Sequence, residues 1–210
     1  MKILVLSDIH GKTSALREIV QKPLAKKADA VVVAGDLTTL GSKEEALALL
    51  EILSFAEIFA VPGNMDSLET LSAMEEINAS LHCKKREFKG FVFTGIGGGL
   101  SGEAGETKYT EKEIERLLTP LALKDCILVT HLPPKNSHID IAGERHIGSN
   151  AIRKILLEKK PALHLCGHAH ESRNTEWIGK TLCVNAGPAK EGCAAIVEIE
   201  KGKKPEAELF

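Results

Sequence analysis

Aromatic residues are scarce in this chain of 210 residues, where Phe, Trp and Tyr together make up only 4%. An excess of one charge is also missing, because 27 Lys and Arg against 29 Asp and Glu give a formal net charge of −2. This balance excludes a general electrostatic attraction to nucleic acid or to anionic membranes. With 43% of its residues apolar, the chain also falls outside the class of disordered proteins.

Long apolar runs are absent as well. The run at the amino terminus, residues 1–6, is too short for the core of a secretory signal. The most apolar stretch, residues 46–61, is interrupted by Glu51 and Glu57 and cannot span a bilayer. These features predict a cytoplasmic protein that does not bind a membrane.

Paired cysteines are a further absence. The five cysteines are odd in number, far apart and mostly inside apolar runs, and no two of them form a CxxC pair. We therefore interpret them as small buried hydrophobic residues, and expect no structural zinc or redox site.

What the sequence does contain is a regular alternation of short apolar runs and longer amphipathic segments. Several runs are apolar at nearly every position, as in strands that are covered on both faces. The length suits one compact domain spanning 1–210, and the alternation predicts an α/β fold with a partly parallel sheet. The predicted strands are 3–6, 30–34, 58–61, 91–94, 126–130, 162–166, 181–184 and 194–199.

Four helices are predicted from their starting residues. Capping signatures begin at Ser42, Asp66 and Thr110, and a fourth amphipathic segment runs from Ser149 until Pro161 ends it. The glycine-rich segment 95–105 matches neither known phosphate-loop pattern. It is predicted to be a flexible connection, with a phosphate-binding loop as the alternative.

Five of the predicted strands end in residues that can bind a metal. In α/β sheets, the crevice beyond the carboxyl ends of the strands is where ligands bind, so these five strand ends can form one site. Each motif alone is common in turns, whereas five in the same topological position indicate a function. The candidate metal ligands are Asp8, His10, Asp36, Asn64, His131, His168 and His170.

The motifs occur in the order DxH, GD, GN, H and GHxH, which resembles the calcineurin-like metallophosphoesterase superfamily. The resemblance extends from Asp8 to His170, and Asn185 to Pro188 also look like that family. It implies a four-layer α/β sandwich of two mixed β-sheets flanked by helices, with a two-metal centre bridged by Asp36. The first metal would be bound by Asp8, His10, Asp36 and His170, and the second by Asp36, Asn64, His131 and His168.

Two divalent cations suit the hydrolysis of a phosphate ester, because they lower the pKa of a shared water and bind the phosphoryl oxygens. The mixed imidazole, carboxylate and carboxamide set suits Mn, Fe, Zn, Ni or Co. We therefore expect a phosphodiesterase that cleaves a small or nucleotide-like diester by attack of a hydroxide bound to both metals. The expected catalytic residues are Asp36, Asn64 and His131.

One position departs from the family pattern. Many members have a His directly after the Asn of the GN motif, where it stabilises or protonates the leaving group, and this chain has Met65. General acid catalysis is worth about 10²- to 10⁴-fold. Its loss favours phosphodiesters, monoesters with good leaving groups, or a slow enzyme, over a broad phosphomonoesterase.

Three further residues are candidates for contact with the substrate or for proton transfer. Asn64, His146 and Lys12 are candidate substrate-binding residues. For His146 an exposed loop histidine is the simpler interpretation, and for Lys12 a solvated lysine at the start of a helix. His146 and His138 are also candidate proton donors in place of the missing histidine, and for each an exposed or hydrogen-bonded loop histidine is the simpler interpretation. Asp66 is predicted to cap the helix that follows it.

Two alternative functions remain. A nuclease of the same superfamily would need a basic surface that follows several phosphates. The basic clusters 26–27, 84–86 and 201–204 are short and are interpreted as solvated loops, so a nucleic-acid partner is not expected. A non-catalytic, protein-binding scaffold with this fold is the other alternative, and the filled ligand motifs argue against it. A homo-oligomer is compatible with the sequence.

Overall fold

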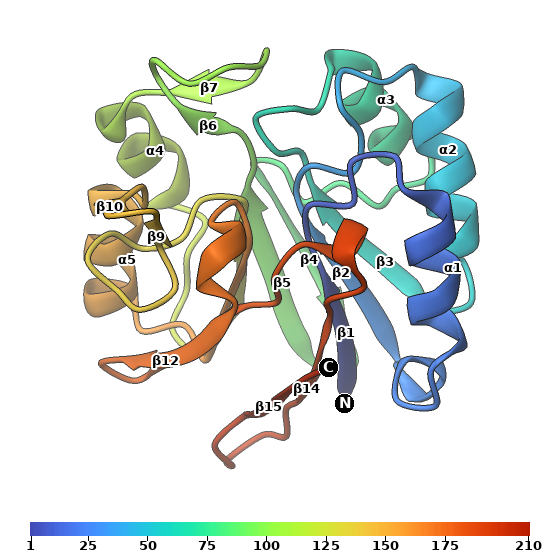
Figure 1. Ribbon diagram of the computed structural model, residues 1–210. Helices are drawn as coiled ribbons and strands as arrows, with labels where there is room; N and C mark the ends of the chain where they lie inside the picture. The colour runs from blue at the N-terminus through green and yellow to red at the C-terminus, as the bar shows by residue number, and fades with distance from the viewer.

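The computed structural model describes residues 1–210 and contains two mixed β-sheets packed face to face (Figure 1). The first has the order β15 (Glu206–Leu209), β14 (Ala195–Glu198), β1 (Lys2–Leu6), β2 (Ala30–Ala34), β3 (Glu57–Val61). The second has the order β12 (Asn174–Ile178), β13 (Thr181–Asn185), β11 (Leu163–Cys166), β8 (Ile127–Thr130), β5 (Phe91–Ile96), β4 (Lys84–Phe88).

Each sheet is parallel at its centre and antiparallel at an edge. In the first sheet β1, β2 and β3 run parallel, and β14 and β15 complete it in antiparallel pairing. In the second, β5, β8, β11 and β13 run parallel, between antiparallel edge strands β4 and β12. The carboxyl ends of the parallel strands therefore meet along one end of each sheet, and the loops that follow them are available to form a site.

Helices cover the outer face of each sheet, which makes four layers (Figure 1). The first sheet is covered by α1 (Thr13–Gln21), α2 (Lys43–Ile52) and α3 (Leu68–Glu76), and the second by α4 (Glu111–Leu118) and α5 (Asn150–Lys159). Three apolar clusters separate the layers. The central cluster joins the two sheets and includes Phe59 stacked on Phe93, with ring centroids 4.0 Å apart.

The predicted fold class is confirmed, and each of the eight predicted strands overlaps an observed one. Ser42, Thr110 and Ser149 each accept a hydrogen bond from the helix that they begin. The prediction that Asp66 caps α3 is wrong, because Ser67 occupies that position and accepts from the backbone N–H of Thr70. No helix is long and apolar enough to pass through a lipid bilayer.

Some elements were not predicted. Helix α1 has no side-chain cap, and the charged strand β4 lies where a solvated loop was predicted for residues 84–86. The glycine-rich segment contains the end of β5 and also β6 (Gly99–Leu100), which pairs with β7 (Lys108–Tyr109). The segment is therefore held by strand pairing and differs from the flexible connection that was predicted.

Candidate metal centre

Five loops bring the predicted ligands together at one end of the sandwich. The loops follow β1, β2 and β3 of the first sheet and β8 and β11 of the second. Asn64 Oδ1 and His168 Nδ1 lie 3.0 and 3.2 Å from His131 Nε2. Two groups of three side chains could each bind a metal ion, because within each group the ligand atoms lie within 4.8 Å of one another. One group is Asp8, His10 and His170, and the other is Asp8, Asp36 and His131.

The loops after β1 and β2 are joined by backbone hydrogen bonds. The N–H of Asp8 donates to the carbonyl of Gly35 over 3.0 Å, and the N–H of His10 donates to the carbonyl of Asp36 over 2.9 Å. Asp8, His10 and Asp36 have φ values of 56°, 47° and 52°, in the left-handed region that Asp and His tolerate better than most residues. Such strained conformations concentrate at functional sites, where the surroundings fix them.

The loop after β3 orients Asp36. The backbone N–H of Met65 donates to Asp36 Oδ1 over 2.8 Å. The residue at position 63 must be glycine, because a Cβ atom there would lie 1.9 Å from the same carboxylate oxygen. The glycine of the GN motif thus allows the loop to approach the carboxylate closely.

His131 and His10 each have one ring nitrogen turned toward Asp36. His131 Nδ1–H donates to the carbonyl of Ala34 over 2.9 Å, so Nε2 is the nitrogen that faces Asp36 Oδ2, at 3.5 Å. A hydrogen bond of this type fixes the tautomer of metal-binding histidines. His10 Nε2 is buried without any hydrogen-bond partner, 3.7 Å from the same oxygen. A buried nitrogen that lacks a partner beside a carboxylate fits a cation-binding site.

The electrostatics of the cluster also fit cations. Burial opposes the ionisation of Asp8 and Asp36, but contacts with His170 and His131 outweigh burial and lower the pKa of both carboxyls. Burial likewise opposes the charging of His131, yet the Asp36 charge beside it raises the pKa of His131 to about 10. Two buried carboxylates thus stabilise positive charge between them, as a site for divalent cations does.

Two charged residues at the cluster were missed from the sequence. Lys190 lies after β13 with its Nζ atom 3.4 Å from His170 Nδ1, and its backbone N–H donates to the carbonyl of Asp8. Glu103 lies on the glycine-rich segment with Oε1 3.3 Å from His168 Nε2. The only available signals were a lysine just beyond a strand end and an acidic residue among glycines.

The predicted substrate-binding residues have separate surroundings. Lys12 is exposed at the start of α1, directly after the loop that contains Asp8 and His10. His146 lies on β10 (Arg145–His146), which pairs with β9 (Ile141–Ala142), and its Nδ1 is 2.7 Å from Asp140 Oδ1. His138 is also exposed. A role for these residues in substrate binding or proton transfer remains a prediction.

Asp66 links two of the loops that contain candidate ligands, those after β2 and β3. Its carboxylate accepts hydrogen bonds from the backbone N–H groups of Gly63, Leu37 and Thr38, at 2.8, 3.1 and 2.7 Å. Burial, together with the nearby charge of Asp36, raises the pKa of Asp66 to about 6. The residue stabilises the loops after β2 and β3, in place of the helix-capping role predicted for it.

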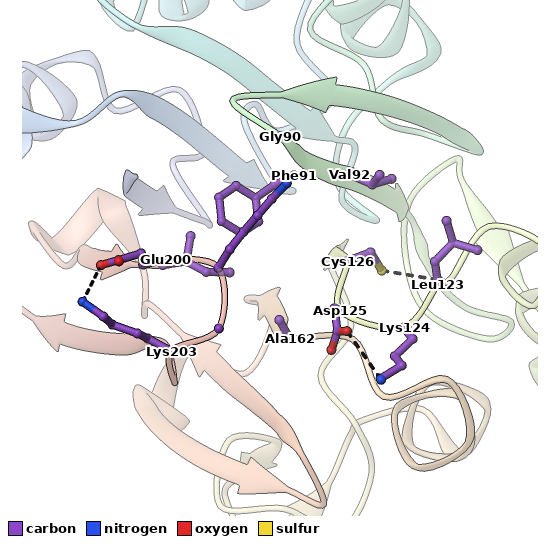
Figure 2. A pocket seen from close by; sticks show the side chains of 13 residues that line it. Gly90, Phe91, Val92, Leu123, Lys124, Asp125, Cys126, Ala162, Glu200 and Lys203 are labelled. Atoms are coloured by element: carbon purple, nitrogen blue, oxygen red, sulfur yellow. Dashed lines mark hydrogen bonds and ion pairs between the residues drawn. The ribbon is translucent and has the colours of Figure 1, made fainter.

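A cavity of about 510 Å³ opens at the other end of the strands (Figure 2). Its walls include Gly90 and Phe91 at the start of β5, Cys126 just before β8, and Glu200 and Lys203 beyond β14. These positions mark the amino ends of the parallel strands, and none of the predicted ligands lines the cavity. It is therefore separate from the candidate metal centre.

Comparisons with known proteins agree with this geometry. The sequence profile of the calcineurin-like phosphoesterase family matches residues 1–172. The chain is 35% identical to the uncharacterized protein MJ1162 of Methanocaldococcus jannaschii over 198 residues, which cover 90% of this chain and 88% of that protein. It is 25% identical to the "probable glycerophosphodiester phosphodiesterase GpdQ" of Arcobacter nitrofigilis, with 87% of this chain and 70% of that one covered.

Solved structures share the fold. The structure of the protein TT1561 from Thermus thermophilus superposes with a TM-score of 0.79 at 22% identity, covering 99% of this chain and 97% of that one. The structure described as a novel archaeal phosphodiesterase gives a TM-score of 0.56 at 17% identity and covers all of both chains. At these identities the likeness concerns the arrangement of helices and strands.

Proposed function

The chain belongs to the calcineurin-like phosphoesterase family, and we propose that it is a metal-dependent phosphodiesterase acting on a small or nucleotide-like diester. The observation that carries this proposal is the gathering of two buried carboxylates and four histidines at the carboxyl ends of strands from both sheets. The similarity to the Arcobacter protein named as a glycerophosphodiester phosphodiesterase supports a diester substrate.

Two divalent cations fit the residues present. Asp8, His10 and His170 would bind the first, Asn64, His131 and His168 the second, and Asp36 would bridge them. When bound, such a pair lowers the pKa of water and neutralises phosphoryl oxygens. The mixed imidazole, carboxylate and carboxamide set, without thiolate, favours Mn, Fe, Zn, Ni or Co over magnesium or calcium alone.

The residues of the chain orient this site and complement the charge of the substrate. The carbonyl of Ala34 fixes the His131 tautomer, and the Met65 N–H fixes the Asp36 carboxylate. Lys190 is half-buried beside His170, so its ammonium group can pair with an anionic phosphodiester. Buried, oriented groups of this kind need no reorganisation when the substrate binds.

The substrate class follows from position 65. Met65 has no ionisable group, and His146 is paired with Asp140 on the β9–β10 hairpin. Without an imidazole at position 65, the site lacks the group that would protonate a poor leaving group there. Such an enzyme favours diesters and good leaving groups over alkyl phosphomonoesters.

The test is a substrate panel with the full-length protein and added Mn, Fe, Zn, Ni or Co. We expect turnover of bis-p-nitrophenyl phosphate that EDTA abolishes and added metal restores, with a higher kcat/KM than for p-nitrophenyl phosphate. Faster hydrolysis of the monoester contradicts the diester preference. No turnover with any metal contradicts an enzyme and favours a scaffold, whereas salt-dependent binding and cleavage of DNA favour a nuclease.

A further inference from the structure

The glycine-rich segment contacts two of the residues that would bind the second metal. Glu103 Oε1 lies 3.3 Å from His168 Nε2, and the side-chain amide of Asn64 donates to the carbonyl of Ala104 over 3.3 Å. Only glycine fits at position 105, where φ is +101° and a Cβ atom would lie 1.5 Å from the Asn64 carbonyl oxygen. The backbone of this segment therefore rests directly on the GN loop.

The His168 ring has its two nitrogens in different surroundings. Nδ1 faces His131 Nε2 at 3.2 Å, inside the cluster, and Nε2 faces the Glu103 carboxylate. The side chains of His168 and Glu103 are only 13% and 26% exposed. The carboxylate therefore lies beside Nε2, the ring nitrogen turned away from the cluster, and favours the tautomer in which Nδ1 is left free to face the metal position.

Glu103 is itself fixed in place. Its second oxygen accepts from the backbone N–H of Leu100 over 2.9 Å, and its own N–H donates to the Leu100 carbonyl over 3.1 Å. These bonds close a turn directly after β6. The carboxylate thus has one oxygen for the turn and one for His168.

We propose that Glu103 is a positioning residue that orients His168 and thereby sets the affinity of the second metal position. The inference rests on the proposed function, because it assumes that the cluster binds two cations. Carboxylates that orient metal-binding histidines typically change metal affinity by about 10- to 100-fold when they are replaced. Glu103 acts at the second position only, since the first includes neither His168 nor Asn64.

The test is calorimetric titration of Mn²⁺ into the metal-free, full-length protein. E103A should weaken one of two binding events by about 10- to 100-fold and leave the other unchanged. E103Q can keep the Leu100 contact through its amide oxygen, but its NH₂ group then faces His168. It should therefore weaken the same Mn²⁺-binding event as E103A, while the unfolding free energy of the metal-free protein stays unchanged. E106Q is the matched control, because Glu106 lies directly after the glycine-rich segment and accepts from Leu68 N–H.

The same titration in a His10→Ala variant identifies the affected metal position. His10→Ala removes a ligand of the first position only, so Mn²⁺ binding at the second position should remain and should weaken in the double variant that also carries Glu103→Ala. Two unchanged events in E103A, equal weakening of both events, or equal weakening in E106Q would overturn the role of Glu103. A wild-type protein that binds fewer than two Mn²⁺ ions would instead contradict the proposed function.

Discussion

Met65 binds Asp36 through its backbone: the N–H group donates to Asp36 Oδ1 over 2.8 Å. Its carbonyl accepts from the N–H of Leu40 over 2.7 Å. Both bonds are available to any residue other than proline, so the side chain at position 65 can change without loss of the carboxylate's orientation. The missing imidazole therefore removes a proton donor, whereas the backbone hydrogen bonds that orient Asp36 are kept.

Met65→His should supply a proton donor for the leaving group. We expect turnover of alkyl esters to rise by about tenfold or more, within the range of general acid catalysis, with little change for p-nitrophenyl esters. The measurement is kcat for a series of diesters that differ in leaving-group pKa. M65Q is the control, and an equal dependence on leaving group in the wild type and M65H would contradict this role of position 65.

Asp36→Asn should remove the bridge between the metals. An asparagine keeps an oxygen for the Met65 N–H, so the fold should persist while the charge is lost. We expect loss of tight metal binding and a fall in kcat by orders of magnitude, measured by metal analysis and hydrolysis of bis-p-nitrophenyl phosphate. Asp125→Asn, at a carboxylate 75% exposed, is the control; D36N with full metal content would refute the bridge.

Lys190→Ala should weaken substrate binding. A hydrogen bond to a charged group is worth about 1.5–3 kcal/mol, so KM should rise by roughly tenfold or more with little change in kcat. Lys12→Ala removes the same charge from the exposed start of α1 and tests the prediction made for that residue. An equal KM in K190A and the wild type would exclude Lys190 from the substrate site.

His164 makes stability depend on pH. Thr130 Oγ1 donates to the Leu132 carbonyl, so His164 Nε2–H donates to Thr130 and the buried Nδ1 has no partner. Burial lowers the pKa of His164 to about 3. Between pH 6.5 and 3 the unfolded chain therefore binds a proton that the folded protein does not, and stability falls as pH falls through this window.

His164→Leu should remove that contribution, and the Thr130 hydroxyl keeps its Leu132 partner. Between pH 7 and pH 5, the loss of unfolding free energy should be smaller in the variant than in the wild type by about 2 kcal/mol. Urea unfolding of the metal-free proteins at the two pH values measures this difference. Parallel losses in both proteins would show that His164 is not responsible.

The sequence was most informative where burial and topology act together. Strand β2 was predicted at its observed bounds because all five of its positions are buried. The gathering of the candidate ligands could be predicted because the carboxyl ends of parallel strands lie along one edge of a sheet. Helix α1 was missed because Lys12 gives no capping signal, and β4 because its charged side chains have partners that only the fold supplies, such as Glu75 for Lys84.

The residues around the cluster were harder to predict. Glu103 reaches His168 only because the glycine-rich segment folds back over the GN loop. Lys190 reaches His170 only because β13 lies beside β11, so that the loops that follow these two strands are neighbours. Both contacts depend on loop conformations for which short-range sequence patterns contain no signal.

Anomalous diffraction from crystals of the Mn²⁺-loaded protein tests the central claim most directly. The account predicts two peaks roughly 3.5 to 4 Å apart, with Asp36 between them, Asp8, His10 and His170 around one, and Asn64, His131 and His168 around the other. A single peak, or peaks bound by residues elsewhere in the protein, would contradict it.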